Sequence, residues 1–292
     1  MEIKLLDHKE LKTFPSGSGI EFFDDKVYLV GDDATNIIVK SKKWKMEKKI
    51  HLFDSPSERI PKLIKSDLEA TTIVFEGKTP KLLMLGSGSR LAYRNKAILL
   101  DLNTSSTEEF DLEIFYNRLK EHGVYDLNIE GAAAIDDNVL LCNRGNKSNP
   151  SNCIILTSNG FWKNQAAAEI LILRLEIEQP EGQFIGVSGL TYSEKNDWLL
   201  FTTSTEHTYN AIDDGEIGDS YLGIIENVTR KIGRKKMKIN ELINLPKADK
   251  IFKGHKIESL CIQRDKESNL KLHLVSDNDL GHTALFKIRL KA

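Results

Sequence analysis

The sequence predicts an all-β protein, a five-bladed β-propeller, and two observations carry that prediction. Five segments of the 292-residue chain share one pattern: a Ser or Glu, then a small residue, then a short apolar run. Their opening residues are 51 to 70 residues apart around the chain, including the step through the two termini, and this spacing suits one four-stranded blade per repeat. We therefore expect one propeller domain over residues 1–292. The opening residues are Ser18, Glu69, Glu130, Ser188 and Glu258.

Each repeat continues as a β-hairpin is expected to. Turn-forming residues follow the first run, for example Asp24-Asp25-Lys26 and Asp136-Asp137-Asn138, and a second apolar run comes next. The fifth repeat has a third strand at 283–290 but no fourth, so we expect residues 2–7 to complete that blade and close the ring without a free edge. In the other repeats, the third and fourth strands are predicted at 36–40 and 44–52, 96–102 and 107–114, 153–157 and 169–177, and 221–225 and 236–245.

Four antiparallel strands per blade give approximate blade boundaries of 8–52, 67–114, 128–177, 186–245, and 256–290 with 2–7. Helical periodicity is weak, and only residues 115–123 and 240–245 are predicted to form short helical turns. No stretch has the composition of an interdomain linker or a low-complexity segment.

Composition narrows the classes of function. Lys and Arg number 41 against 43 Asp and Glu, so a nucleic acid or an anionic membrane is not expected as the main partner. No apolar run reaches the roughly 18 residues of a membrane span, and no signal peptide is visible, so a cytoplasmic monomer is expected, or an exported protein if a leader was trimmed. Cys142, Cys153 and Cys261 include no Cys-x-x-Cys pair, which argues against a disulfide scaffold and a zinc ribbon.

The opening residues predict a metal site. The innermost strand of each blade lines the central channel, so five equivalent positions should face one another around the axis. Three carboxylates there would repel one another unless a proton is shared or a cation lies between them. Oxygen ligands without thiol or imidazole favour Ca²⁺, and a wide channel fits Mg²⁺ less well. The predicted ligands are Ser18, Glu69, Glu130, Ser188 and Glu258, although ordinary solvated residues before strands remain an alternative.

The ends of the second strands should form a further shell near one face of the disc. Asp32 and Asp33 are the predicted catalytic residues, which would orient or deprotonate a metal-bound water. Arg90 and Arg144 are expected to bind a phosphate or carboxylate group. Surface turn residues are the alternative for every member. The predicted substrate-binding set is Ser87, Arg90, Asn143, Arg144, Glu206, His207 and Asp277, with Asp279 a further acid nearby.

The order Ser, Glu, Glu, Ser, Glu at the inner-strand starts resembles that of the calcium-activated nucleotidases, or animal apyrases. That resemblance implies a five-bladed propeller with Ca²⁺ in the channel, hydrolysing nucleoside di- and triphosphates. Gly31-Asp32-Asp33-Ala34-Thr35 is similar to the acidic turn of the family's first blade, and Asn143-Arg144 falls at its basic pair. The chain departs from the family at Ser87-Gly88-Ser89-Arg90, where the family carries Lys-Glu-Trp.

A second resemblance leaves alternatives open. Glu130-Gly131-Ala132, Glu258-Ser259-Leu260 and Ser276-Asp277-Asn278-Asp279 look like the pattern of phytase-like and esterase-like propellers. Lactonases of the gluconolactonase and paraoxonase group also hold Ca²⁺ in the channel. The leading hypothesis is a Ca²⁺-dependent hydrolase of a phosphate ester or phosphoanhydride, with a small anionic substrate. The alternatives are a lactonase or esterase, and a non-catalytic module with a structural ion and a protein partner.

Overall fold

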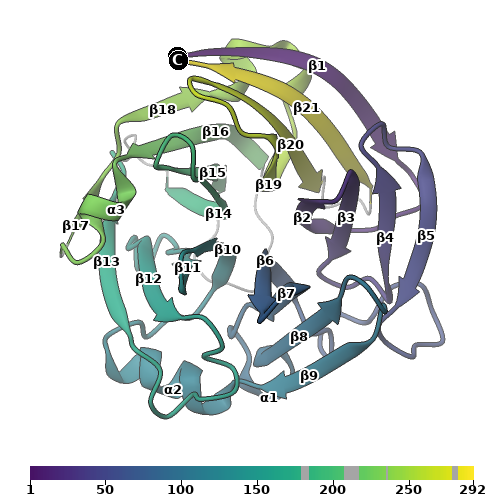
Figure 1. The fold of residues 1–292 in the computed structure, drawn as a ribbon, viewed down its shortest axis with the longest axis vertical. Helices are drawn as coiled ribbons and strands as arrows, with labels where there is room; N and C mark the ends of the chain where they lie inside the picture. The colour runs from purple at the N-terminus through teal and green to yellow at the C-terminus, as the bar shows by residue number, and fades with distance from the viewer. Residues whose placement is uncertain (179–183, 207–216, 235, 278–281) are drawn as a thin grey trace.

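Five β-sheets, each with four antiparallel strands from the inside outward, surround a central axis in the computed structural model (Figure 1), so the predicted all-β, five-bladed propeller is confirmed. The structure describes residues 1–178, 184–206, 217–234, 236–277 and 282–292. Blade 1 contains β2 (Gly17–Phe23), β3 (Lys26–Gly31), β4 (Asn36–Ser41) and β5 (Met46–His51); blade 2 contains β6 (Leu68–Glu76), β7 (Thr79–Gly86), β8 (Lys96–Asp101) and β9 (Thr107–Asp111).

The other three blades follow the same inside-to-outside order. Blade 3 contains β10 (Ile129–Ile135), β11 (Asn138–Asn143), β12 (Cys153–Ser158), β13 (Leu171–Glu176) and β17 (Lys236–Lys238). Blade 4 contains β14 (Ile185–Ser193), β15 (Trp198–Glu206), β16 (Ile217–Glu226) and β18 (Glu241–Asn244). Blade 5 contains β19 (Lys256–Arg264), β20 (Asn269–Asp277), β21 (Thr283–Lys291) and β1 (Glu2–Leu11).

The N-terminal strand closes the ring as predicted and is longer than expected. β1 pairs with β21 from Glu2 opposite Lys291 to Leu11 opposite Thr283. Residues 8–11 therefore belong to blade 5 and not to blade 1. The first and last strands of the chain lie side by side at the outer edge of one blade (Figure 1).

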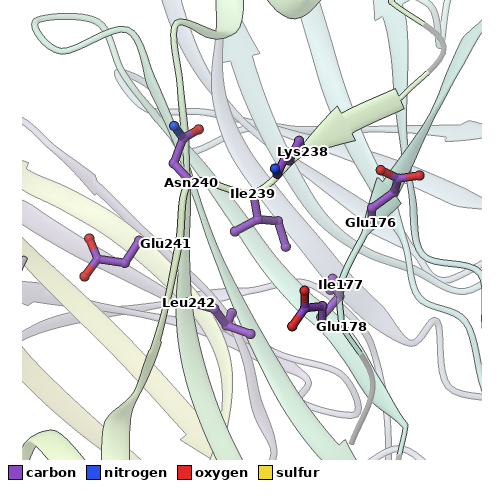
Figure 2. A pocket seen from close by; sticks show the side chains of 8 residues that line it. All are labelled: Glu176, Ile177, Glu178, Lys238, Ile239, Asn240, Glu241 and Leu242. Atoms are coloured by element: carbon purple, nitrogen blue, oxygen red, sulfur yellow. The ribbon is translucent and has the colours of Figure 1, made fainter.

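The predicted fourth strand of blade 4 at 236–245 is wrong in part. Residues Lys236–Lys238 pair in parallel with β13 of blade 3, and only Glu241–Asn244 pairs with β16 of blade 4. The chain thus crosses from the edge of one blade to the edge of the next within a few residues. A groove at this crossing is lined by residues 176–178 and 238–242 (Figure 2).

Helices are short and lie between strands. The turn predicted at 115–123 is α2 (Glu113–Glu121), whose Phe115, Tyr116 and Leu119 are buried against blades 2 and 3. The turn predicted at 240–245 is wrong, because β18 occupies 241–244 and a helix begins only at Leu245, where the Asn244 side chain caps it by accepting from the Lys247 N–H. The remaining helices are α1 (Leu91–Arg94), α3 (Val228–Lys231), α4 (Leu245–Ala248) and the 3₁₀ turn η1 (Lys250–Phe252). None of the helices in the described ranges is long and apolar enough to cross a membrane.

The hydrophobic core consists of five clusters, each between two neighbouring blades. Successive side chains of a strand point to opposite faces of its sheet, so each inner blade face packs against a neighbouring blade. In β2, for example, Ile20 packs toward blade 5 and Phe23 toward blade 2. This packing fixes the blades around the axis and places the starts of the inner strands together.

Candidate functional site at the channel mouth

All five predicted ring residues lie in β-bulges. The pairing between the first and second strands of each blade shifts by one residue at that position, so the ring residue has no direct partner across the hairpin. A bulge bends its strand and redirects the side chain of the extra residue. The repeated sequence pattern therefore corresponds to one repeated backbone feature at Ser18, Glu69, Glu130, Ser188 and Glu258.

The small residue after each ring residue allows neighbouring inner strands to approach closely. A Cβ on Gly131 would lie 2.7 Å from the backbone nitrogen of Leu190 in the next blade. A Cβ on Gly189 would lie 2.8 Å from the Cα of Ser259, again in the next blade. Distances under 3.0 Å to backbone atoms leave no room for a side chain, so these two positions require glycine for close packing.

The two ring serines connect blades through hydrogen bonds. The Ser18 hydroxyl donates to the carbonyl of Leu68 at 2.5 Å, and the Ser188 hydroxyl donates to the carbonyl of Ile257 at 2.6 Å. Each acceptor immediately precedes the ring glutamate of the next blade. Both serines are buried. Their protons are therefore used in interblade contacts, and only their oxygens remain for the predicted role as metal ligands.

The three ring glutamates have different surroundings. Glu130 accepts a hydrogen bond from Asn128 Nδ2 at 2.6 Å, and Glu258 forms an ion pair with Lys256 at 3.0 Å. Glu69 makes no side-chain hydrogen bond or ion pair within the described residues. Glu69 is therefore the ring carboxylate whose oxygens are most accessible to a ligand.

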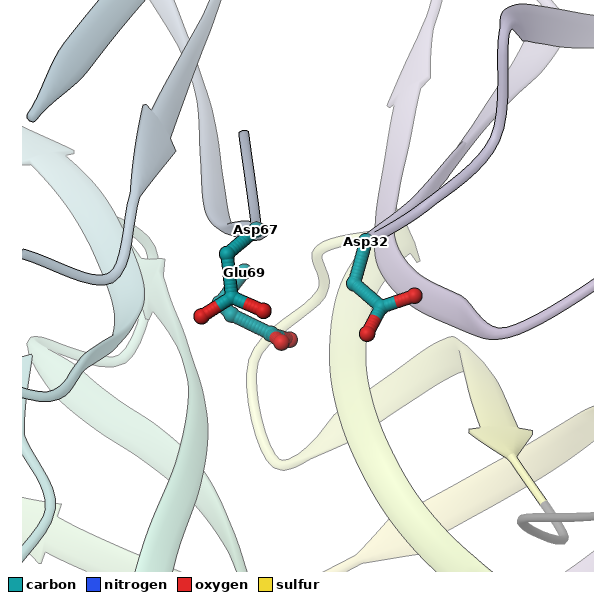
Figure 3. A group of neighbouring side chains, drawn as sticks. All are labelled: Asp32, Asp67 and Glu69. Atoms are coloured by element: carbon teal, nitrogen blue, oxygen red, sulfur yellow. The ribbon is translucent and has the colours of Figure 1, made fainter. Parts of the chain in front are cut away.

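Glu69 belongs to a cluster of three acids that joins the inner ring to the predicted second shell. One carboxylate oxygen from each of Asp32, Asp67 and Glu69 lies within 4.8 Å of the other two. Figure 3 shows the three carboxylates directed toward the space between blades 1 and 2. Asp32 follows β3, whereas Asp67 and Glu69 stand at the start of β6. We call Asp32, Asp67 and Glu69 the acid trio.

Two cations hold the acid trio in place. Lys65 Nζ forms ion pairs with Asp32 and, at 2.7 Å, with Asp67. Arg94 Nη1 donates to the other oxygen of Asp67 at 2.6 Å, which also accepts from the Ser87 hydroxyl at 2.5 Å. Both Asp67 oxygens are thus occupied. Asp67 also has a positive φ of 54°, a backbone conformation that is uncommon outside glycine and persists where the surroundings fix it.

Burial and mutual repulsion raise the pKa of two members of the acid trio, Asp32 and Glu69. Burial, followed by the nearby charges of Asp33 and Asp67, raises the pKa of Asp32 to about 6, although Lys65 acts in the opposite direction. Burial, together with the charges of Asp67, Asp32 and Glu130, holds the pKa of Glu69 well above its usual value. Burial lowers the pKa of Lys65, but the three carboxylates around it more than compensate and raise it. The trio therefore favours added positive charge, from a proton or a cation.

Asp33, the second predicted catalytic residue, points to a separate partner. Its Oδ2 accepts from Arg59 Nε at 2.8 Å, and Arg59 also donates to the Ser16 hydroxyl at 3.1 Å. The other oxygen, Oδ1, is buried without a hydrogen-bond partner. The Oδ1 of Asp32 is also buried, and neither of these two oxygens has a hydrogen-bond partner among the described residues. Asp32 and Asp33 thus each have one buried oxygen whose hydrogen-bonding or coordinating capacity a bound ligand would satisfy.

The predicted substrate-binding residues do not form one group. Arg144 is buried, and its Nη1 donates to the carbonyls of Gly186 and Val187 and to the Ser204 hydroxyl in blade 4. The Asn143 side chain accepts from the N–H of Asn128 and donates to the carbonyl of Asp126. Among the predicted residues that the structure describes, Ser87 is the one with a hydrogen bond to the acid trio, on Asp67. Arg144 and Asn143 thus connect elements of the fold.

The remaining members of the predicted set lie at the ends of strands or beside a short helix, or lie outside the described residues. Arg90 is exposed at the start of α1, where its guanidinium lies 5.9 Å from the centre of the Tyr93 ring. Glu206 is the last residue of β15. Asp277 is the last residue of β20 and lies opposite Lys256 in the pairing of β20 with β19. His207 and Asp279 lie outside the described residues. The prediction of a binding role for this group therefore remains a prediction.

Lys65, Asp67 and Arg94 were missed by sequence reasoning. Asp67 could have been found, because it stands two residues before ring residue Glu69, as Ser16 does before Ser18, and both have positive φ. Lys65 belongs to the connection between blades 1 and 2, which has no counterpart in the repeat. Arg94 is four residues beyond the predicted Arg90, and the short α1 helix brings it back to the channel mouth.

The comparisons with known proteins support the fold. The model of a family described as a family of unknown function, DUF6929, matches residues 13–290. A glutaminyl cyclase from Myxococcus xanthus has a similar structure, with a TM-score of 0.54, 7% sequence identity, and coverage of 99% of this chain and 96% of that chain. A putative exported protein from Bacteroides fragilis has a TM-score of 0.44 at 11% identity, over 99% and 96% of the two chains. No curated protein sequence is significantly similar to this chain.

Proposed function

The chain belongs to this family of unknown function, and from its own residues we propose that it binds a divalent cation at the acid trio and hydrolyses a phosphate ester or phosphoanhydride. One observation carries the proposal: Asp32, Asp67 and Glu69 bring one carboxylate oxygen each to within 4.8 Å of the others, at the mouth of the channel. The proposed cation is Ca²⁺, because carboxylate oxygens suit a hard ion and Ca²⁺ accepts irregular oxygen coordination more readily than Mg²⁺ does.

The chemistry of the donor set fits this cation. Asp32 Oδ1 is buried and has no hydrogen-bond partner, and Glu69 makes no hydrogen bond within the described residues. Both acids have a raised pKa, which is what burial and crowding of carboxylates produce before a cation compensates them. The oxygens of Asp67 already contact Lys65, Arg94 and Ser87. Asp67 would therefore hold these side chains in position beside the cation.

A bound cation would polarise a substrate oxygen and lower the pKa of a coordinated water. The chain's own residues would do the rest. Asp33 Oδ1, buried and without a partner, would accept the proton of the attacking water, and Arg59 on Oδ2 would keep that carboxylate oriented. The Lys65 ammonium, which lies between Asp32 and Asp67, would stabilise negative charge on the phosphoryl oxygens.

A second candidate, without catalysis, also has a specific observation in its favour. Lys65 and Arg94 already place two positive charges against the acid trio. The cluster would then join blades 1 and 2 electrostatically, and any ion would only add to that connection. A lactonase or esterase would use the same cation on a different substrate. Hydrolysis is therefore tested both on phosphate compounds and on lactones.

The test is a thermal melt after treatment with EDTA, followed by addition of Ca²⁺ or Mg²⁺. A ligand at 100 times its Kd stabilises a protein by about 2.7 kcal/mol, so a rise of several degrees is expected with Ca²⁺. Glu69→Gln should abolish most of this rise. Glu258→Gln is the matched control, because that ring carboxylate pairs with Lys256 and lies outside the trio. An equal effect of both variants would favour the full ring, and no rise with either ion would overturn the cation site.

Hydrolysis is tested separately with p-nitrophenyl phosphate, nucleoside triphosphates and lactones, with and without Ca²⁺. Asp33→Asn keeps the shape of the side chain and removes its basicity, so it should lower kcat at least 100-fold while the Ca²⁺-dependent rise in Tm stays. Calcium binding without turnover of any substrate in the panel would instead support the non-catalytic candidate.

A further inference from the structure

A row of four basic side chains crosses blade 5, away from the acid trio. Arg264 of β19 pairs directly with Lys271 of β20, which pairs with Arg289 of β21, which in turn pairs with Lys4 of β1. Directly paired residues of antiparallel strands project from the same face of the sheet. All four strands of the blade therefore contribute one positive charge to one line. We call Arg264, Lys271, Arg289 and Lys4 the cation row.

The cation row has no compensating acids in contact. None of its four side chains makes a hydrogen bond or ion pair with another residue in the described part of the chain. Like charges directly opposite each other on neighbouring strands destabilise a sheet, and here the arrangement occurs three times in succession. The nearest acids in the pairing pattern are Glu2, two residues before Lys4 and opposite Lys291, and Asp7, opposite Lys287.

Solubility does not account for the row. Lysine on an edge strand is a common protection against edge-to-edge association, and it would explain Lys4 on the outer strand β1. Arg289 and Lys271 lie on interior strands, where no free edge needs protection. Both side chains are partly buried, so their charges are less well solvated than those of an ordinary surface lysine.

The surface around the row is hollowed and remains positive. A groove is lined by Glu2, Lys4, Arg289 and Lys291. Along the same face, Lys287 pairs with His273 and with Asp7 and places its ammonium 4.7 Å from the centre of the Trp44 ring. Burial, and then the charges of Lys287 and Lys271, lowers the pKa of His273 to about 3.

We propose that the cation row binds an extended oxyanion ligand, a chain of linked phosphate groups, across the four strands of blade 5. Neighbouring strands lie about 4.8 Å apart, so the row spans about 14 Å. An anion placed over two neighbouring cations would replace their repulsion by charge-assisted hydrogen bonds, and Arg289 can offer two parallel donors. This site is independent of the acid trio, because blade 5 and the space between blades 1 and 2 share none of the residues involved.

The test is calorimetric titration of the full chain with inorganic tripolyphosphate at low salt in the presence of EDTA, which removes any cation from the channel. Tripolyphosphate should bind at least tenfold more tightly than orthophosphate, since it contacts more than one cation. Arg289→Gln and Lys271→Gln should each weaken binding at least tenfold, and the slope of log Kd against log salt should fall by about one for each cation removed. Lys78→Gln, at an exposed turn of blade 2, is the control and should change neither quantity.

A second readout excludes a purely structural role. Because Arg289 lies between two like charges, Arg289→Gln should leave the Tm of the ligand-free protein unchanged or slightly higher, while the ligand-induced rise in Tm is lost. Equal binding of orthophosphate and tripolyphosphate would overturn the extended site. Unchanged affinity in Arg289→Gln and Lys271→Gln, or the same loss in Lys78→Gln, would overturn the cation row as the binding surface.

Discussion

The boundary between blades 1 and 2 and the boundary between blades 4 and 5 use the same serine contact in different electrostatic surroundings. At the first boundary, Ser18 donates to Leu68, and the neighbouring side chains are the charged Lys65 and Asp67. At the second, Ser188 donates to Ile257, and its hydroxyl also approaches Thr202 at 3.1 Å. The repeat therefore supplies the interblade hydrogen bond, and residues outside the repeat supply the charges.

The segments that lead into the two inner strands explain this difference. Residues 57–67 bring Arg59, Lys65 and Asp67 to the first boundary, where they meet Asp32 and Asp33. The segment before β19 brings His255, whose carbonyl accepts from Ser220 and whose ring contacts Ser276. A shared backbone frame thus carries a cluster of several charged side chains at one boundary, and neutral hydrogen bonds beside the Glu258–Lys256 ion pair at the other.

The largest expected effect concerns the charged boundary. Asp67→Asn should lower the free energy of unfolding by about 3 kcal/mol, because it removes one partner from the buried Lys65 and Arg94. Asparagine tolerates positive φ, so the backbone should not add to the loss. Urea denaturation measures it. Asp25→Asn is the control, since Asp25 also has positive φ and pairs with Lys42 at an exposed site. An equally small effect in both variants would show that the ionic cluster contributes little to stability.

A smaller effect is expected from the serine contact that the two boundaries share. Ser18→Ala and Ser188→Ala should each cost about 1.5 kcal/mol, because each leaves a buried carbonyl without its donor. The two losses should agree if the contact acts independently of its surroundings. Ser57→Ala, which removes a hydroxyl donor at an exposed position, is the control for urea denaturation. A much larger loss in Ser18→Ala would show coupling between the serine and the charged cluster and would contradict the comparison.

The smallest effect is the pH dependence of stability at the boundary between blades 4 and 5. Burial, and then the nearby His8, lowers the pKa of His255, whereas Glu10 acts in the opposite direction. The folded state thus prefers the neutral ring, and stability should fall as the pH drops through and below about 6.5, where the unfolded chain takes up the proton. The ring is only partly buried and faces His8, Ser276 and Phe286, so the loss should stay below about 1 kcal/mol.

Thermal melts between pH 5 and pH 8 test this expectation. His255→Gln should flatten the acid side of the stability profile relative to the unchanged chain, whereas His122→Gln, on the exposed end of α2, should not. If His255→Gln leaves the stability profile unchanged, protonation of this ring does not change the stability of the boundary between blades 4 and 5.

The repeat made the fold and part of the site predictable. Inner strands, hairpin turns and ring closure follow from local patterns that recur five times, so each repeat supports the interpretation of the others. The strands at 236–245 were less predictable, because an outer strand can pair with either of two blade edges and β17 joined blade 3. Asp32 was predicted at the site, but its partner Lys65, and Arg94, which pairs with Asp67, do not belong to the repeated pattern.

By itself, the sequence determined the number of blades, the five ring positions and the return of the N-terminus to the last blade, because all three depend on short-range patterns and spacing. Only the tertiary structure decided which of those positions carry accessible charge. The acid trio depends on a non-repeated connection that crosses to the channel mouth, and the cation row depends on the register of four strands drawn from both ends of the chain. Pairing register and long-range ion pairs follow from the packing of the whole ring, and no single segment specifies them.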